Sequence, residues 1–105
     1  MKNKHLLSFG EFTLDLKEKK LNQNGEPVSI PPKVFALLEV LIKNEGQIVE
    51  KDELMREVWA DSFVEESNLT YSIRQLRKIL GDDYLQPKFI DTLPRKGYRF
   101  IAEVK

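Results

Sequence analysis

The stretch Asn68 to Leu80, N-L-T-Y-S-I-R-Q-L-R-K-I-L, decides the fold, because an apolar stripe and a basic face share one predicted helix there. Leu69, Ile73, Leu76 and Leu80 recur at i, i+4, i+7 and i+11. At 3.6 residues per turn this spacing places all four side chains on one side of the helix. We therefore expect that side to face a hydrophobic core.

The opposite side of this helix is polar and cationic. It gathers Ser67, Tyr71, Arg74 and Lys78, with Thr70, Gln75 and Arg77 on its flanks, and it carries no carboxylate. Thr, Tyr and Gln side chains can bond base edges, whereas Arg and Lys neutralise phosphates, so the face suits the DNA major groove. A lone amphipathic helix is more often an ordinary solvated one, so this interpretation depends on the rest of the chain.

The composition is that of a single soluble domain. A chain of 105 residues can bury a core without staples, and the absence of cysteine excludes disulfides and cysteine-based zinc sites. No apolar run approaches the roughly 20 residues of a membrane span, and the N-terminus lacks a signal peptide's apolar region. We expect a cytoplasmic domain, and nothing in the sequence predicts a cofactor or a metal.

The charges sum to zero but are segregated along the chain. Residues 1–32 carry five Lys/Arg and four Asp/Glu, residues 33–68 carry four and nine, and residues 69–105 carry eight and four. The basic C-terminal third beside an acidic middle predicts an electrical dipole, whose positive end would meet DNA.

Short strands are predicted before the first helix. Phe12, Leu14 and Leu16 alternate with polar residues, and Asn24-Gly25 is a typical turn. We expect strands near residues 6–9, 12–16, 19–23 and 27–30, which form a small four-stranded antiparallel sheet.

Two helices are predicted between this sheet and the basic helix. Pro31-Pro32 opens the first, because proline in the first turn loses no hydrogen bond, and Gly46 ends it. Residues 47–49 predict a bridging strand, and the second helix runs from about residue 51 to residue 59.

The basic helix itself is predicted for residues 65–80. Ser62 and Glu65 could form a capping box at its start, and Gly81 stops it. Beyond it, two apolar runs flank Pro94-Arg95-Lys96-Gly97, which predicts a β-hairpin with two cations at its tip.

The assembled pattern resembles the OmpR/PhoB-type winged-helix DNA-binding domain from about residue 9 to residue 104. The resemblance rests on I-P-P-K-V-F-A-L-L, K-D-E-L-M-R-E-V-W, the basic helix and T-L-P-R-K-G-Y-R-F. The Pro-Arg-Lys wing is most similar to the ToxR/CadC-like branch. The resemblance implies an α+β winged helix-turn-helix with an N-terminal four-stranded antiparallel sheet, three helices and a C-terminal hairpin wing.

The resemblance also implies a DNA-binding surface and partners. The third helix would enter the major groove, and the wing would reach the minor groove or its phosphates. The implied DNA-binding residues are Asn68, Arg74 and Arg77 near phosphates, Thr70, Tyr71 and Gln75 near base edges, together with Lys78, Arg95 and Lys96. Trp59 would lie close to the DNA backbone. Gln75 stands where many members have a basic residue.

Members of this family often bind direct-repeat half-sites as head-to-tail pairs, under control of a further domain. We therefore expect residues 1–105 to be one winged-helix domain excised from a longer regulator, with residues 1–5 flexible. The further domain would be a sensor, a receiver or a membrane-linked domain, so the full-length protein could be membrane-anchored. RNA polymerase is a candidate partner.

The sequence leaves two other function classes open. Catalysis has little support, because Glu65-Glu66 and Asp82-Asp83 are adjacent pairs that point in different directions, and no nucleotide-binding, metalloprotease or nucleophile motif occurs. The stronger alternative is a winged-helix protein-interaction module without DNA affinity, whose contact surface would be the acidic segment 45–66.

Overall fold

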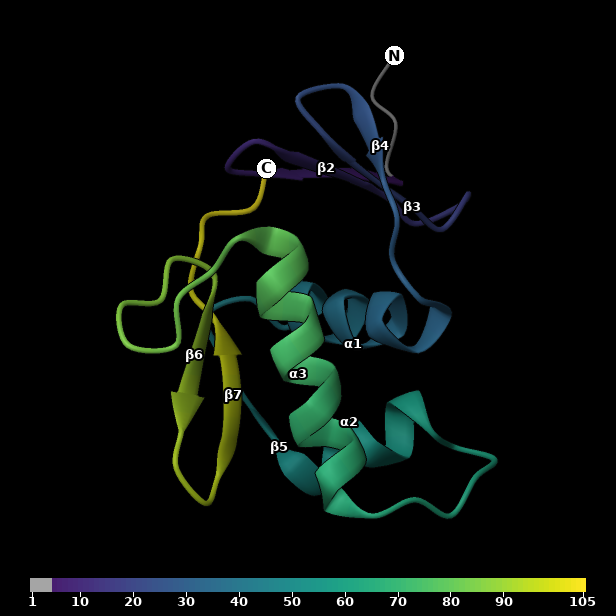
Figure 1. Ribbon diagram of the computed structural model, residues 1–105, viewed down its shortest axis with the longest axis vertical. Helices are drawn as coiled ribbons and strands as arrows, with labels where there is room; N and C mark the ends of the chain where they lie inside the picture. The colour runs from purple at the N-terminus through teal and green to yellow at the C-terminus, as the bar shows by residue number, and fades with distance from the viewer. Residues whose placement is uncertain (1–4) are drawn as a thin grey trace.

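The computed structural model describes residues 5–105 and consists of a small sheet, three helices and a C-terminal hairpin (Figure 1). The elements are β1 Leu6–Phe9, β2 Phe12–Asp15, β3 Lys20–Gln23, β4 Glu26–Val28, α1 Pro32–Lys43, β5 Ile48–Glu50, α2 Lys51–Val58, α3 Glu66–Leu80, β6 Ile90–Leu93 and β7 Gly97–Phe100. This order confirms the predicted α+β winged helix. Residues 1–5 are the segment expected to be flexible, and residues 1–4 of it lie outside the described part of the chain.

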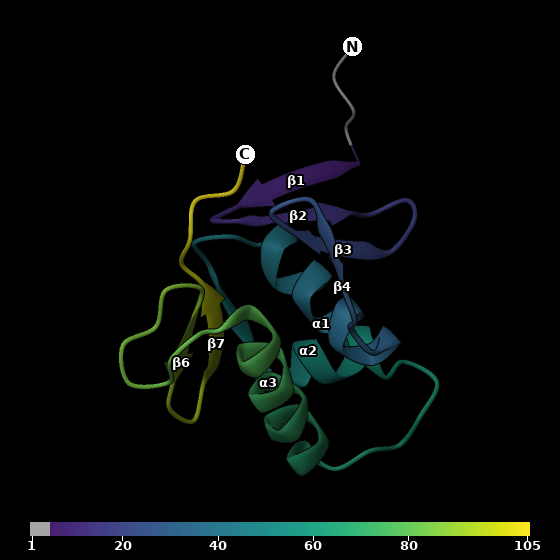
Figure 2. The same cartoon turned by 45° about the horizontal axis from the view of Figure 1, so that its top comes forward.

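The N-terminal strands form an antiparallel meander in the order β1-β2-β3-β4. Alternation of buried and partly exposed residues along β2 turns Phe12 and Leu14 inward, as the period of two predicts. The sheet lies against the helices on the side away from the hairpin tip (Figures 1 and 2). Hydrogen bonds between the backbones of Ser8 and Lys105 tie the C-terminal end of the chain to β1.

A cluster of aromatic rings joins the sheet to the hairpin. The ring of Phe9 stacks on Phe12 with centroids 5.4 Å apart and meets the edge of Phe100 at 5.2 Å. Phe89 contacts both Phe9 and Phe12 from the loop that precedes β6. Large buried rings of this kind contribute both apolar area and preferred edge-to-face geometry, so the two sheets share one core.

The hairpin docks against the start of α2. The second sheet has the order β5-β7-β6, and Val49 of β5 lies opposite Tyr98 of β7. Gly97 at the start of β7 packs so closely on β5 that a Cβ there would collide with the carbonyl oxygen of Val49 and the backbone of Glu50. The hairpin beside α3 is therefore also fastened to the N-terminus of α2 (Figure 1).

Several predicted boundaries need correction. β2 ends at Asp15 rather than residue 16, β3 begins at Lys20 rather than residue 19, and α2 ends at Val58 rather than residue 59. The fourth strand ends at Val28 rather than residue 30, because the chain already turns toward the helix, and α1 ends at Lys43 although Gly46 adopts the expected left-handed conformation. The capping box of Ser62 and Glu65 is wrong, because α3 begins at Glu66 with Glu65 as its N-cap and without a side-chain cap bond. Gly81, with φ +69°, ends α3 as predicted.

Candidate nucleic-acid interface

Helix α3 crosses the middle of the molecule and presents one face to solvent beside the hairpin (Figures 1 and 2). Its predicted stripe is confirmed as core, since Leu69, Ile73, Leu76 and Leu80 are all at most 4% exposed. The stripe packs on α1 and α2, which fixes the direction of the outer face.

The outer face of α3 carries most of the predicted polar set. Asn68, Thr70, Arg74 and Lys78 are exposed, Tyr71 is 60% exposed, and Gln75 is half-buried. From Ser67 to Leu80 the helix contains no carboxylate. Tyr71 and Gln75 lie one helical turn apart, so both can approach neighbouring positions on a ligand that lies along the helix.

Arg77 departs from its predicted place on the flank of the solvent face. Its side chain is only 9% exposed, and its Nη2 donates to the carbonyl oxygen of Ile90 at 3.0 Å and to Oγ1 of Thr92 at 2.6 Å. Its guanidinium also lies 5.3 Å from the ring centroid of Tyr84. The reason is tertiary: β6 packs on that flank of α3 and covers the arginine.

The hairpin tip carries Arg95 and Lys96, both exposed. Arg95 has φ +67°, a conformation that a non-glycine residue adopts only where the turn demands it. The amide of Lys96 donates to the carbonyl of Leu93 at 2.9 Å, and the amide of Lys51 donates to the carbonyl of Lys96 at 3.1 Å. The first residue of α2 therefore holds the tip in place.

A half-open cleft of about 690 Å³ separates α3 from the hairpin. Its lining residues come from α2, α3, the following loop and both hairpin strands: Lys51, Thr70, Ile73, Arg74, Arg77, Lys78, Asp82, Tyr84, Thr92 and Tyr98. The sequence interpretation identified the α3 members but not Lys51, Tyr84, Thr92 or Tyr98. Lys51 reaches the cleft only because β5 pairs with β7, and no local pattern signals that pairing.

Carboxylates also lie close to the hairpin tip. Glu50, Asp52 and Glu66 share a small hollow with Arg95 and Lys96. Glu66 is paired with Lys51, whose Nζ lies 3.0 Å from its Oε2. Arg74, Lys78, Arg95 and Lys96 take part in none of the ion pairs found between residues 5 and 105. On the outer face of α3 and at the hairpin tip, these four exposed cations can attract an anionic ligand.

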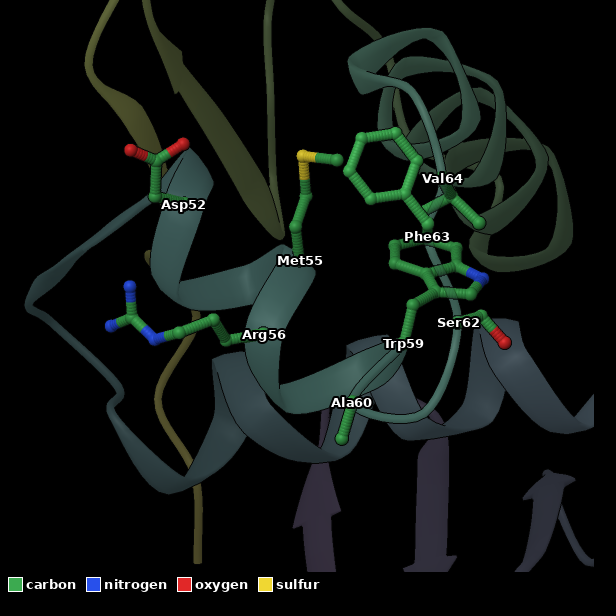
Figure 3. A pocket seen from close by; sticks show the side chains of 8 residues that line it. All are labelled: Asp52, Met55, Arg56, Trp59, Ala60, Ser62, Phe63 and Val64. Atoms are coloured by element: carbon green, nitrogen blue, oxygen red, sulfur yellow. The ribbon is translucent and has the colours of Figure 1, made fainter.

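A second hollow lies under the loop between α2 and α3 (Figure 3). Met55, Trp59, Phe63 and Val64 supply its apolar lining, and Asp52 and Arg56 stand at its edge. Trp59 is 9% exposed and packs in the core, whereas Phe63 is fully exposed. Trp59 therefore stabilises the core, whereas Phe63 is the aromatic ring that the loop exposes to solvent.

Within residues 5–105 no group of three potential metal-ligating side chains comes together, and none of the helices there is long and apolar enough to cross a membrane.

Comparison with known proteins gives consistent matches. Residues 25–100 match the family model described as "Transcriptional regulatory protein, C terminal". The transcriptional regulator HilA of Salmonella typhimurium is 40% identical over 96 residues, which are 91% of this chain but 17% of HilA. The chain thus corresponds to about one sixth of that relative.

Two solved structures share the fold over nearly their whole length. The DNA-binding domain of Klebsiella pneumoniae RstA, solved in complex with the RstA box, superposes with a TM-score of 0.81 at 31% identity, over 91% of this chain and 96% of that one. The DNA-binding domain of E. coli CadC superposes with a TM-score of 0.84 at 28% identity, over 99% and 98% of the two chains.

Proposed function

This chain belongs to the family of transcriptional regulatory protein C-terminal domains, of OmpR/PhoB type, and we propose that it binds double-stranded DNA in a sequence-specific manner. Helix α3 enters the major groove, and the wing formed by β6 and β7 contacts the adjacent minor groove or its phosphates. The family consists of DNA-binding domains of regulators rather than enzymes.

The observation that carries the proposal is the outer face of α3. It exposes hydroxyl, phenol and cationic side chains over three turns without a carboxylate, although the chain as a whole is neutral. A carboxylate-free face is what close approach to phosphates requires. Tyr71 and Gln75 supply groups that can contact base edges, and glutamine can bond adenine through two hydrogen bonds.

We propose a division of labour among the exposed side chains. Asn68, Arg74 and Lys78 contact phosphates on either side of the groove, while Thr70 joins Tyr71 and Gln75 at the base edges. Arg95 and Lys96 stand at the end of the wing, where they meet phosphates or a narrow minor groove. Arg77 is withdrawn from the phosphate set, because it is buried.

We propose further that residues 1–105 act as one DNA-binding domain of a longer cytoplasmic or membrane-anchored regulator. The support is the match to only 17% of HilA. A sensor, receiver or membrane-linked domain would control head-to-tail pairing of such domains on direct repeats, which lie about one helical turn apart.

Salt dependence tests the proposal directly. Four free cations, Arg74, Lys78, Arg95 and Lys96, predict that log K plotted against log salt has a slope of roughly −4. The measurement is fluorescence anisotropy on a random duplex between 50 and 200 mM salt, about the range over which such contacts weaken strongly. A slope near zero would exclude DNA binding and favour the protein-interaction alternative.

Sequence specificity is tested by selecting bound duplexes from a random pool and then competing single-base variants of the selected site. Alanine at Tyr71 or Gln75 should change which base is preferred, by roughly 1 to 3 kcal/mol at the contacted position. Alanine at Arg95 or Lys96 should weaken all sequences almost equally. The proposed division of labour fails if the wing variants shift the base preference and the α3 variants do not.

The apolar hollow under the loop that joins α2 and α3 supports a second role as a contact for RNA polymerase. A fully exposed phenylalanine beside Met55 and Trp59 is typical of a protein contact. Phe63→Ser should leave DNA affinity unchanged but abolish the additional shift that purified RNA polymerase gives on a DNA-bound complex. An equal polymerase shift with both proteins excludes this role.

A further inference from the structure

We propose that Arg77 is a positioning residue that ties α3 to the wing and sets where the wing tip meets DNA. The proposal rests on the DNA binding proposed above. In it Arg77 acts through the hairpin and does not contact the ligand, whereas Arg74, one turn earlier on the same helix, contacts phosphate directly.

The geometry of Arg77 joins α3 to β6 at two points. Its Nη2 donates both to the carbonyl oxygen of Ile90 and to the hydroxyl of Thr92, at 3.0 and 2.6 Å. The two acceptors, a backbone carbonyl and a side-chain hydroxyl, belong to residues two positions apart on β6. Two bonds from one nitrogen to one strand restrain the strand's rotation and its distance from the helix.

The restraint acts immediately below the wing tip. Thr92 is followed by Leu93, the last residue of β6, and then by the turn that carries Arg95 and Lys96. On the other side, the amide of Lys51 holds the tip through the carbonyl of Lys96. The tip is therefore fixed between α2 and α3, and Arg77 provides the α3 side of that attachment.

The chemistry of Arg77 argues for orientation rather than stability. No ion pair in the described part of the chain includes Arg77, and its buried Nε has no hydrogen-bond partner there. A buried charge without a carboxylate partner is usually no more stabilising than an apolar side chain of similar size. What an apolar side chain would not reproduce is the pair of directional bonds to β6.

A double-mutant cycle with the wing tip separates positioning from direct contact. Arg77→Met keeps an unbranched apolar stem and removes the guanidinium, and Arg74→Met is the matched control on the same helix. Thr92→Val removes the second acceptor with little change in shape. Each is measured alone and combined with the tip variant Arg95→Ala/Lys96→Ala, on a duplex selected with the unsubstituted chain, over a range of salt concentrations.

We expect Arg77→Met to weaken binding about ten-fold when the tip is intact, as loss of charged hydrogen bonds would, and less than about two-fold when the tip is already removed. Thr92→Val should behave in the same way, with a loss of about three-fold. Arg74→Met should weaken both backgrounds equally and reduce the magnitude of the salt slope by about one in each.

If Arg77→Met weakens binding equally in the Arg95→Ala/Lys96→Ala variant, Arg77 contacts DNA directly and the proposal is overturned. The proposal is also overturned if Arg77→Met weakens binding neither in the unsubstituted chain nor in that variant. If Arg77→Met does not fold by circular dichroism, Thr92→Val decides by the same criteria. If the unsubstituted chain binds no duplex, the proposed function fails and the role of Arg77 fails with it. If the unsubstituted chain binds DNA but the loss caused by Arg77→Met does not depend on the wing tip, only the proposed role of Arg77 is refuted and DNA binding stands.

Discussion

The carboxylate of Asp82 organises the loop that leads from α3 into the wing, and its removal gives the sharpest test of how the wing is supported. Oδ1 accepts from the amide of Lys88 at 2.7 Å, Oδ2 accepts from the amide of Ile90 at 2.8 Å, and both oxygens share the amide of Phe89 at 3.3 Å. The change is Asp82→Ala.

The expected loss follows from these bonds. Hydrogen bonds to a charged group contribute about 1.5 to 3 kcal/mol each, and the partial exposure of Asp82 lowers that contribution. Two short bonds and one shared bond therefore predict a decrease of about 2 to 4 kcal/mol in the free energy of unfolding. For a domain of this size that corresponds to a Tm lower by roughly 10 to 25 °C.

Urea denaturation followed by circular dichroism measures the loss, and the neighbouring residue supplies the control. Asp83 accepts only from the exposed amide of Leu85, at 3.0 Å, so Asp83→Ala should lower the free energy of unfolding by less than about 1 kcal/mol. Equal losses in the two variants, or a loss below about 1 kcal/mol in Asp82→Ala, would refute the assignment of Asp82 as the loop's organiser.

Two further predictions concern stability elsewhere in the domain. Trp59→Ala should lower the free energy of unfolding in urea by about 3 to 5 kcal/mol, because the indole is buried. Phe63→Ala on the adjacent loop should change it by less than about 0.5 kcal/mol, because that ring is exposed. Similar losses in the two variants would contradict this difference in burial. Partial burial tends to raise the pKa of Glu39, but hydrogen bonds from Lys19 and Lys43 outweigh it and hold the pKa below its ordinary value. Glu39→Gln should therefore lower the free energy of unfolding at pH 7 by less than about 1 kcal/mol. The difference from the unsubstituted chain should vanish as the pH falls below the ordinary glutamate pKa of about 4.3 and through the lowered pKa of Glu39. A difference that persists at pH 2 would contradict this prediction.

The elements of this fold were predictable from sequence where local periodicity determines burial. The spacing of Leu69, Ile73, Leu76 and Leu80 places one stripe in the core whatever α3 packs against. Arg77 shows the limit of this reasoning. It follows Ile73 by one turn and so lies near the edge of the stripe, and only the docking of β6 decides that it is buried.

The role of Gly97 could not be deduced from sequence for a similar reason. Pro94-Arg95-Lys96-Gly97 predicts a turn, and Gly97 would then serve the turn's shape. In the structure the left-handed residue is Arg95, whereas Gly97 is required because the backbone of β5 passes where its Cβ would be. Pairing between residues almost fifty positions apart leaves no signal in the local pattern.

The segregation of charge along the chain overstates how well it is separated in space. Glu50, Asp52 and Glu66, all from the acidic middle segment, lie at the hollow below Arg95 and Lys96, and Glu66 neutralises Lys51. The positive potential at the proposed interface therefore comes chiefly from four free cations and the buried Arg77. So few phosphate contacts provide weak binding that falls quickly with salt, and strong binding would require a second domain on the same DNA. The proposed pairing of two domains on direct repeats would supply the missing phosphate contacts, and affinity for one half-site should stay low even when the site is optimal.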